Sequence, residues 1–415
     1  MQNQQGSLSS VTIKKEPYEM KYRWVMLTLV SLLYACFGYV QRSMSPLVTP
    51  IIKDLNISYS QMGIILGAWQ LTYVIMATIG GTVIDRFGIR KSLLFGIFVI
   101  GLSAAFRYFA SGFFFMLFCV AIFGFGGPMI SIGCPKTISE WFTGKERGTA
   151  VGIYMAAMAT GGLAAFSLTN SVIMPLTGYS WRLTFLLASL PAFITAILWW
   201  FLARDIKSTE AKQTGSIIRI FTGLIQIRNV RIVLIMGLLS FTISHGFTNW
   251  LPNIMETGGL TPSVASFAAS IPLLIGIPSV LVIPRATKPH QRGYALAILY
   301  FVAMISLLIT ATTSGAILIT GLCLWGISSI CCMPILMLVL MDIPEVGAKY
   351  MGSAGGLFFC IAEIGGFLGP AILGAVKNIA GTFLSGAILM AVLALILATM
   401  SLMLKIRSIS QPKTS

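Results

Sequence analysis

The stretch GGTVIDRFGIRK, residues 80–91, joins two apolar runs that are each long enough to cross a membrane. Glycine lacks a Cβ atom, so Gly81 and Gly88 are expected to allow a close helix approach and a tight turn. The stretch also holds four charged residues that can form an ion cluster at the membrane surface: Asp85, Arg86, Arg90 and Lys91. Beside the end dipole of a neighbouring helix, such a cluster can act as a gate that opens and closes.

Composition places the chain in a membrane. Of its 415 residues, 56% are hydrophobic and 10% are charged, whereas a soluble chain carries about 25% charged residues. The polar surface is therefore too small to cover a water-soluble particle. A helix needs about 20 apolar residues to cross the hydrocarbon core. The sequence holds twelve such segments: 23–47, 60–83, 91–110, 113–138, 148–173, 182–203, 230–252, 262–284, 292–312, 314–341, 348–375 and 381–404.

The polar segments between these spans indicate the domain organisation and the orientation. The longest, 204–229, predicts an N-terminal bundle over 22–203 and a C-terminal bundle over 230–404. If the N-terminus lies inside, the only basic residues of the outer segments are Lys53, Arg182 and Lys377, and the other segments between the spans hold many more. This asymmetry follows the positive-inside rule. We therefore expect a multi-pass protein of the cell (inner or plasma) membrane, with cytoplasmic tails at 1–21 and 405–415 and a cytoplasmic central loop at 204–229.

The two halves resemble each other in sequence. The first segment ends in QRSMSPLVTPI and the seventh in TNWLPNIMETG, with Pro46 and Pro252 at matching places. An internal repeat that spans each half of the chain predicts an all-α protein whose two six-helix bundles are related by a pseudo-twofold axis, with a site between them.

Several function classes are not expected. The net charge of +16 is spread over short segments and forms no continuous patch, which argues against nucleic-acid binding. The seven cysteines all fall inside apolar runs, and no two of them are spaced as Cys-x-x-Cys. They are therefore interpreted as packing residues and not as disulfides or metal ligands. With two histidines and no paired catalytic residues, the chain is not expected to be an enzyme or to need a cofactor.

The pattern Gly-x-x-x-Asp-Arg-x-Gly-x-Arg-Lys in residues 81–91 resembles the signature of the major facilitator superfamily between its helices 2 and 3. Within that superfamily, QRSMSPLVTPI, NWLPNIMETGGL and GFLGPAILG look like the cyanate/nitroimidazole permease branch. Arg42 occupies the place of that branch's arginine, and Trp250, Leu251 and Pro252 match its Trp-Leu-Pro. The resemblance implies a small anion as substrate, while Gln41 and Glu363 depart from the branch's pattern.

Arg42 lies in the first apolar segment, roughly 27 Å beyond Trp24 at 1.5 Å per residue. An arginine inside hydrocarbon costs about 2.5–3.5 kcal/mol on insertion scales. One interpretation is that its side chain extends to the outer headgroups. The other, which we favour, is that its planar guanidinium holds a carboxylate or similar anion through two hydrogen bonds.

Glu363 stands alone among apolar residues in FFCIAEIGGFLGP, residues 358–370. A buried carboxylate is either ion-paired or protonated, and one that changes between these states can carry a proton. Three roles remain open: a static ion pair with Arg42, proton coupling, and direct contact with a cationic group of the substrate.

Other polar residues in the apolar segments have less decisive patterns. His245 and Asn249 are four residues apart and share one helix face, and His245 is either a second proton-coupling group or a side chain satisfied by a neighbouring helix. Arg107 is expected to extend to the headgroups or to form a structural pair, and Lys136 to lie at a gate or on lipid. The remaining predicted substrate contacts are hydrogen-bonding or aromatic: Tyr34, Gln41, Trp69, Gln70, Tyr73, Trp250 and Trp325.

These features predict a secondary transporter that takes up a small organic or inorganic anion, or a zwitterionic metabolite, by alternating access coupled to protons. The expected partners are the substrate, protons and the lipid bilayer, and the expected state is a monomer. The alternative is a facilitator or exporter of a small cationic amine, choline-like or drug-like, with Glu363 as the main contact and aromatic rings around the charge.

Overall fold

The computed structural model describes residues 17–205 and 217–404. Residues 1–16 of the predicted N-terminal tail, residues 206–216 of the predicted central loop and the predicted C-terminal tail over 405–415 lie outside the described residues, while residues 17–21 of the predicted tail belong to the first helix. Within the described part the chain is all-helical, and twelve helical stretches are long and apolar enough to cross a membrane. The predicted fold class is confirmed.

The first half contains the following elements: α1 (Pro17–Arg42), η1 (Ser45–Leu47), α2 (Val48–Leu55), α3 (Tyr59–Phe87), α4 (Ile89–Phe106), η2 (Arg107–Phe109), α5 (Phe113–Trp141), α6 (Gly144–Leu168), η3 (Thr169–Ile173), α7 (Met174–Leu176) and α8 (Trp181–Leu202). The second half contains α9 (Ile217–Gln226), α10 (Arg228–Thr257), α11 (Pro262–Ala268), α12 (Ile271–Ala286), η4 (Pro289–Gln291), α13 (Arg292–Thr312), α14 (Gly315–Met341), α15 (Gly347–Ala380) and α16 (Phe383–Leu402). The segment 204–229, predicted as a loop, therefore contains the short helix α9, which packs on α10 and α15.

Local signals in the sequence account for several boundaries. Ser58 caps the N-terminus of α3 in a capping box. Its hydroxyl accepts a hydrogen bond from the Gln61 backbone N–H, and the Gln61 side-chain oxygen accepts one from the Ser58 backbone N–H. Gly88 ends α3 and starts α4 with φ of +82°, a conformation that other residues rarely adopt. The tight turn predicted at Gly88 is thus present.

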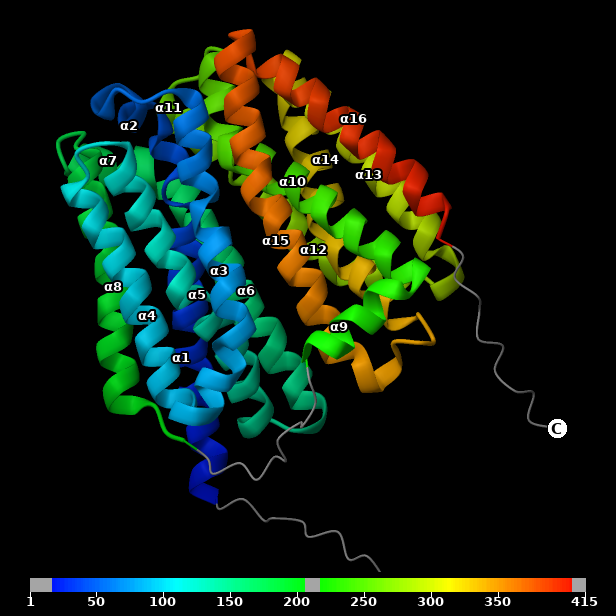
Figure 1. Cartoon of the computed structure of the whole chain (residues 1–415). Coiled ribbons are helices and arrows are strands. Elements are labelled where there is room, and N and C mark those ends of the chain that lie inside the picture. The colour runs from blue at the N-terminus through cyan, green and yellow to red at the C-terminus, as the bar shows by residue number, and fades with distance from the viewer. Residues whose placement is uncertain (1–16, 206–216, 405–415) are drawn as a thin grey trace, which may run out of the picture.

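The two halves repeat the same set of helix contacts. In the first half α1 packs on α6, α3 on α5, and α4 on both α5 and α8. In the second half α10 packs on α15, α12 on α14, and α13 on both α14 and α16. Each pair of the first half has its counterpart at the same place in the order of spans, so the halves form two similar six-helix bundles (Figure 1).

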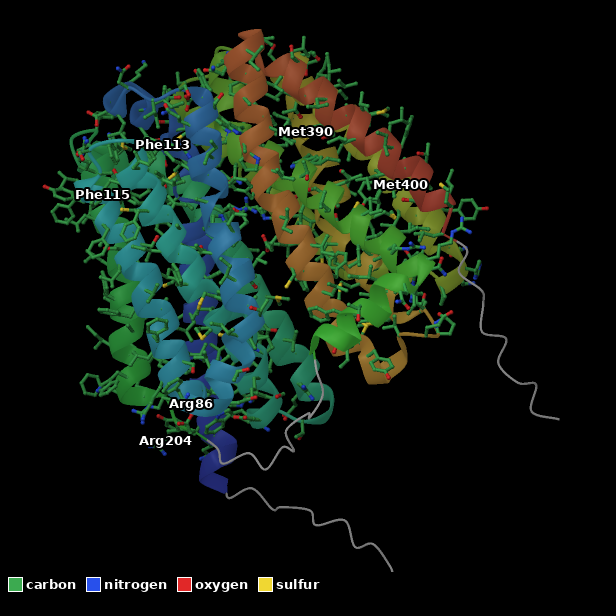
Figure 2. All side chains as sticks on the ribbon, viewed as in Figure 1. Arg86, Phe113, Phe115, Arg204, Met390 and Met400 are labelled. Atoms are coloured by element: carbon green, nitrogen blue, oxygen red, sulfur yellow. The ribbon has the colours of Figure 1, made fainter. Side chains whose placement is uncertain are left out.

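The ends of the bundles differ in composition. We call the end at which α1 begins and α16 ends the termini side, and the other end the opposite side (Figure 1). Figure 2 shows Arg86 and Arg204 at the termini side and Phe113 and Phe115 at the opposite side. This agrees with the charge asymmetry of the sequence.

On the opposite side, α3 and α15 join the two halves through closely approaching backbones. A Cβ atom added at Gly63 would lie 2.4 Å from the Pro370 carbonyl oxygen, and one at Gly67 would lie 2.7 Å from that of Phe367. Real Cβ atoms do not come so close, so glycine is required at both places. The corresponding seam between α6 and α12 has far fewer contacts.

On the termini side the same two helices do not touch at their glycines. A Cβ atom at Gly81 of α3, or at Gly352 or Gly356 of α15, would have nothing within 4 Å. The expected close helix approach at Gly81 is therefore absent from this conformation. The two bundles are joined at the opposite side and separated at the termini side.

Gly63→Ala should lower the melting temperature, because overpacking costs about 1–3 kcal/mol and outweighs the roughly 1 kcal/mol of helix propensity gained. Thermal unfolding of the purified protein measures the effect. Gly81→Ala, in the same helix, is the matched control and should leave the melting temperature unchanged or raise it. Equal melting temperatures for the two variants would show that the α3–α15 contact does not hold this state.

A second set of contacts closes the opposite side. Asn170, in the π-helical turn η3, donates to the Pro46 carbonyl oxygen of its own half (2.9 Å) and to the Ser266 hydroxyl of the other half (2.7 Å). Asn253 of α10 donates to the Thr49 hydroxyl of α2 (2.6 Å). Thr49 in turn donates to the Glu256 carboxylate. These side-chain bonds cross from one bundle to the other, and Ser263 adds a further one by donating to the Asn170 carbonyl oxygen (3.1 Å).

Asn170→Ala should weaken this closure, because the change removes the bond to Ser266. Spin labels at Lys53 and Thr257, both exposed on the opposite side, would report a longer and broader distance distribution. Ser171→Ala is the control, since its hydroxyl bonds only within its own helix. An unchanged distribution in Asn170→Ala would exclude Asn170 from the closure.

Candidate functional site

A cavity of about 360 Å³ lies between the two bundles. Its walls come from α1 and α6 of the first half and from α12 and α14 of the second. Most lining side chains are small or apolar, including Ala156, Ala159 and Leu273. Among the lining residues, Arg42 carries the only charge and Gln41 lies next to it.

Arg42 is placed in the cavity by a break in the first span. It is the last residue of α1, and the chain then turns into η1 and α2, which extend the same apolar span to Leu55. A cation at a helix C-terminus is favoured by the helix dipole. The Arg42 side chain also packs against Gly162 of α6, where an added Cβ would lie 3.4 Å from its Cγ. The structure thus favours the cavity interpretation of Arg42 over extension to the headgroups.

Arg42 interacts electrostatically with Glu363 of α15 and with His245 of α10. Arg42 therefore interacts, from the first bundle, with two titratable groups of the second bundle. None of the ion pairs within 4.0 Å in the described chain joins Arg42 to Glu363. The static ion pair considered from the sequence is not formed in this conformation.

Glu363 faces Gln70 of α3 across Gly366. A Cβ atom at Gly366 would lie 3.0 Å from Glu363 Oε2 and 3.3 Å from Gln70 Nε2. Glu363 is 8% exposed and Gln70 is fully buried. Within the described residues, Glu363 Oε2 and both polar atoms of the Gln70 amide have no hydrogen-bond partner. Buried polar groups without partners are costly, so this pair is available to a ligand or a proton.

Aromatic side chains surround this polar centre. The Trp69 ring lies 5.8 Å from that of Tyr73 and 6.3 Å from that of His245. The Tyr73 hydroxyl is hydrogen-bonded to Ser131 (2.7 Å) and interacts electrostatically with Glu363. The predicted residues Trp69, Gln70, Tyr73, His245 and Glu363 are therefore brought together from α3, α10 and α15.

Two other predicted contacts lie at the edge of this centre. Tyr34 of α1 is buried against Tyr154 of α6, with ring centroids 4.8 Å apart. Asn249 of α10 accepts a hydrogen bond from Ser45 (3.3 Å), which links the two bundles.

Two predicted tryptophan contacts, Trp250 and Trp325, lie outside the large cavity in this conformation. Trp250 is fully buried between α10 and α15, where its indole N–H donates to the Pro370 carbonyl oxygen (3.0 Å). Trp325 packs against Phe247, with ring centroids 4.9 Å apart, inside the second bundle. Neither lines the large cavity, because the Trp250 ring packs against Tyr59 of α3 (5.9 Å between centroids) and Phe383, and Trp325 packs inside the second bundle.

For Arg107, the expected extension to the headgroups is wrong, and the structural contacts that it makes are with Ser103 and the Phe185 ring. Its side chain is 2% exposed and points into the first bundle, and it does not extend toward headgroups or form an ion pair with a described acid. It lines a small cavity with Gln41, Trp69 and Asn249. Sequence position alone placed Arg107 near the end of an outer helix, and only the packing of α4 against α5 and α8 turns it inward.

The charged residues of segment 80–91 do not form the predicted cluster among themselves. Asp85 pairs instead with Lys136 of α5 (2.7 Å), so Lys136 lies beside this segment, and its role at a gate stays a prediction. The Arg90 backbone N–H donates to Asp205 (3.2 Å), and its guanidinium donates to the Trp200 carbonyl oxygen (2.5 Å). The segment thus ties α3 and α4 to α5 and α8 on the termini side.

The sequence did not indicate the wall that α6 and α12 contribute to the cavity. This wall is formed by apolar and small residues such as Met155 and Ile277, which look the same in sequence whether they face lipid or a cavity. The only available signal was the density of glycine and alanine over 148–165, which is typical of helices that pack closely or line a space.

Comparison with known proteins agrees with this architecture. A hexuronate transporter of Bacillus subtilis is 24% identical over 379 residues, which cover 85% of this chain and 88% of the relative. A putative tartrate transporter of Agrobacterium vitis is 22% identical over 386 residues, which cover 85% and 83%.

Among solved structures, a bacterial homologue of the human lysosomal transporter Spinster, in an inward-facing and occupied conformation, matches with a TM-score of 0.73. The identity is 15%, and the match covers 94% of this chain and 97% of that one. The sequence profile of the Major Facilitator Superfamily matches residues 30–370. Together with the twelve spans in two similar bundles, this match shows that the chain belongs to the Major Facilitator Superfamily.

Proposed function

We propose that the protein is a secondary active transporter that takes up a small organic anion of the sugar-acid class, together with protons. The observation that carries this proposal is the position of Arg42, the only charged side chain in a 360 Å³ cavity between the two bundles. The anion binds the guanidinium of Arg42 through two charge-assisted hydrogen bonds.

The cavity suits a molecule of this size and polarity. Small-molecule sites typically have volumes of about 300–1,000 Å³, apolar walls and few polar groups. Arg42 holds the carboxylate, and Gln41 next to it can bond a hydroxyl group. The small residues of α6 and the aliphatic side chains of α12 accept the face of a sugar ring. The relatives named above are a hexuronate transporter and a putative tartrate transporter, which supports an acidic, hydroxylated substrate. The resemblance to the cyanate/nitroimidazole branch stays a prediction.

Transport follows from the closed opposite side and the separated termini side. In this conformation the α3–α15 contact and the bonds of Asn170 and Asn253 block access from the opposite side. When the bundles rock, these contacts break and the termini-side glycines of α3 and α15 come together. The cavity then opens to the opposite side. The cytoplasmic placement of both termini stays a prediction.

Proton coupling is proposed through Glu363. The groups that face its carboxylate are Arg42 of α1, Gln70 and Tyr73 of α3, and Cys360 of its own helix. Arg42 is the cation that favours the ionised form. When the substrate carboxylate occupies Arg42, Glu363 loses this compensation and takes up a proton, because a buried carboxylate without a countercharge is unstable. His245, which also interacts with Arg42, is the second candidate for this role.

Uptake into proteoliposomes tests the function. Labelled glucuronate, tartrate and a quaternary amine would be offered with and without a pH gradient, and counterflow of the same compounds would be measured. We expect saturable uptake of an acid that rises when the outside is acidified. Uptake of the amine alone would favour the cationic alternative, and non-saturable flux would indicate a channel.

A further inference from the structure

Arg107 is a buried cation that the proposed substrate site does not use. Its Nη2 donates to the Ser103 hydroxyl at 3.3 Å, and its guanidinium lies 5.0 Å from the centre of the Phe185 ring. In the part of the chain that the structure describes, Nε and Nη1 are buried without a hydrogen-bond partner. Leaving a buried charge unpaired costs several kcal/mol. Because the described residues supply no counter-charge to Arg107, we expect the partner to be an anion from solution.

The second bundle shows that this charge is not needed for helix packing. The Ser103 hydroxyl donates to the Cys119 carbonyl oxygen (2.7 Å) and holds α4 on α5. The matching helices α13 and α14 are joined by the same bond, from Ser306 to the Gly321 carbonyl oxygen (2.8 Å). Arg107 follows Ser103 by four residues, and the residue at the same distance from Ser306 is Thr310. One fold position thus carries a charge in one half and a neutral side chain in the other.

The unpaired guanidinium lines a small cavity of about 10 Å³, with the amide side chains of Gln41 and Asn249 also in its walls. This volume accommodates one particle of the size of a water molecule and is far too small for a sugar acid. Gln41 also lines the large cavity, so this one residue borders both spaces. The walls come from the first bundle except for Asn249, which belongs to α10.

We propose that Arg107, with the amides of Gln41 and Asn249, forms a binding site for a monatomic halide ion such as chloride. The ion supplies the negative charge that Arg107 lacks and accepts hydrogen bonds from donors of both bundles. It therefore stabilises the conformation in which Asn249 lies against the first bundle, with the opposite side closed. This site is separate from Arg42 and does not depend on the proposed substrate.

Thermal unfolding tests the site in the full-length purified protein. Replacing sodium methanesulfonate by sodium chloride or bromide at equal ionic strength should raise the melting temperature by about 2–4 °C in a saturable manner, as expected for a bound ligand. Arg107→Thr, which introduces the residue of the second half, should abolish the rise. Arg42→Gln, in the large cavity, should retain it.

Two further measurements decide the proposal if Arg107→Thr does not fold. Bromide diffusion into crystals of the unaltered protein should give an anomalous peak beside Arg107. Chloride should also narrow the distance distribution between spin labels at Lys53 and Thr257. A melting temperature that responds equally in Arg107→Thr, or a bromide peak that is absent or lies elsewhere, would overturn the proposal and assign the space to water. A bromide peak that glucuronate displaces would show that a substrate carboxylate, and not a halide, occupies the site.

Discussion

Arg42→Ala should reduce kcat/KM for uptake of the acidic substrate by about 100-fold or more. Each hydrogen bond to a charged group contributes about 1.5–3 kcal/mol, and the planar guanidinium offers two of them to one carboxylate. The variant also leaves the cavity without a charge, since the other lining residues are neutral. Initial uptake rates in proteoliposomes, normalised to the amount of inserted protein, measure this loss.

Two further variants separate binding from folding. Arg42→Lys keeps the charge and loses the planar fork, so it should retain part of the activity with a raised KM. Arg182→Ala is the matched control, because Arg182 pairs with Asp54 on the exposed opposite side, where an ion pair is worth about 0–1 kcal/mol. Full transport of the acid by Arg42→Ala would remove the anion assignment and leave the fold unaffected.

Glu363→Gln should abolish accumulation driven by a pH gradient while leaving counterflow within a few-fold of the unaltered protein. Glutamine has the shape of the protonated acid, so the substrate can still bind Arg42, but no proton is taken up. For one coupled proton, each unit of pH gradient supplies about 1.4 kcal/mol, or a tenfold accumulation. Steady-state accumulation against the imposed gradient reports this loss directly.

The control for Glu363 is Glu256→Gln, which changes a carboxylate on α10 that bonds Thr49 on the opposite side. It should alter the closure of that side and retain the pH dependence. If Glu363→Gln keeps the full pH-driven accumulation, Glu363 has a structural role and His245 becomes the group to test. Loss of counterflow together with accumulation would instead indicate that Glu363 contacts the substrate.

The fold could be predicted from the sequence because hydrophobic length and charge asymmetry are one-dimensional signals. The twelve spans, the division near residue 204 and the turn at Gly88 each depend on residues close together in the chain. The extra helix α9 was missed because its ten residues, Ile217–Gln226, are too short to register as a span. They follow a polar stretch, which gave them the character of a loop.

The candidate site was only partly predictable. Arg42 and Glu363 stand out because charged residues are rare within apolar spans. The structure places Arg42 in the cavity and Glu363 where it interacts electrostatically with Arg42. Trp250, Trp325 and Arg107 could not be placed, because in a helix that is apolar all round the sequence does not distinguish the face toward lipid, toward the bundle interior or toward a cavity. Only the packing of neighbouring helices decides this.

The uncovered glycines of α3 and α15 have a practical consequence for the transport cycle. Gly81, Gly352 and Gly356 have open space where a side chain would lie, so a bulky residue at one of them fits this state without a clash. In the proposed transport cycle the reverse state brings these glycines together, so we expect a bulky side chain there to exclude that state sterically. Gly81→Leu or Gly352→Leu would therefore permit the present conformation and block the reverse one. The trapped protein would be suited to raising state-specific antibodies.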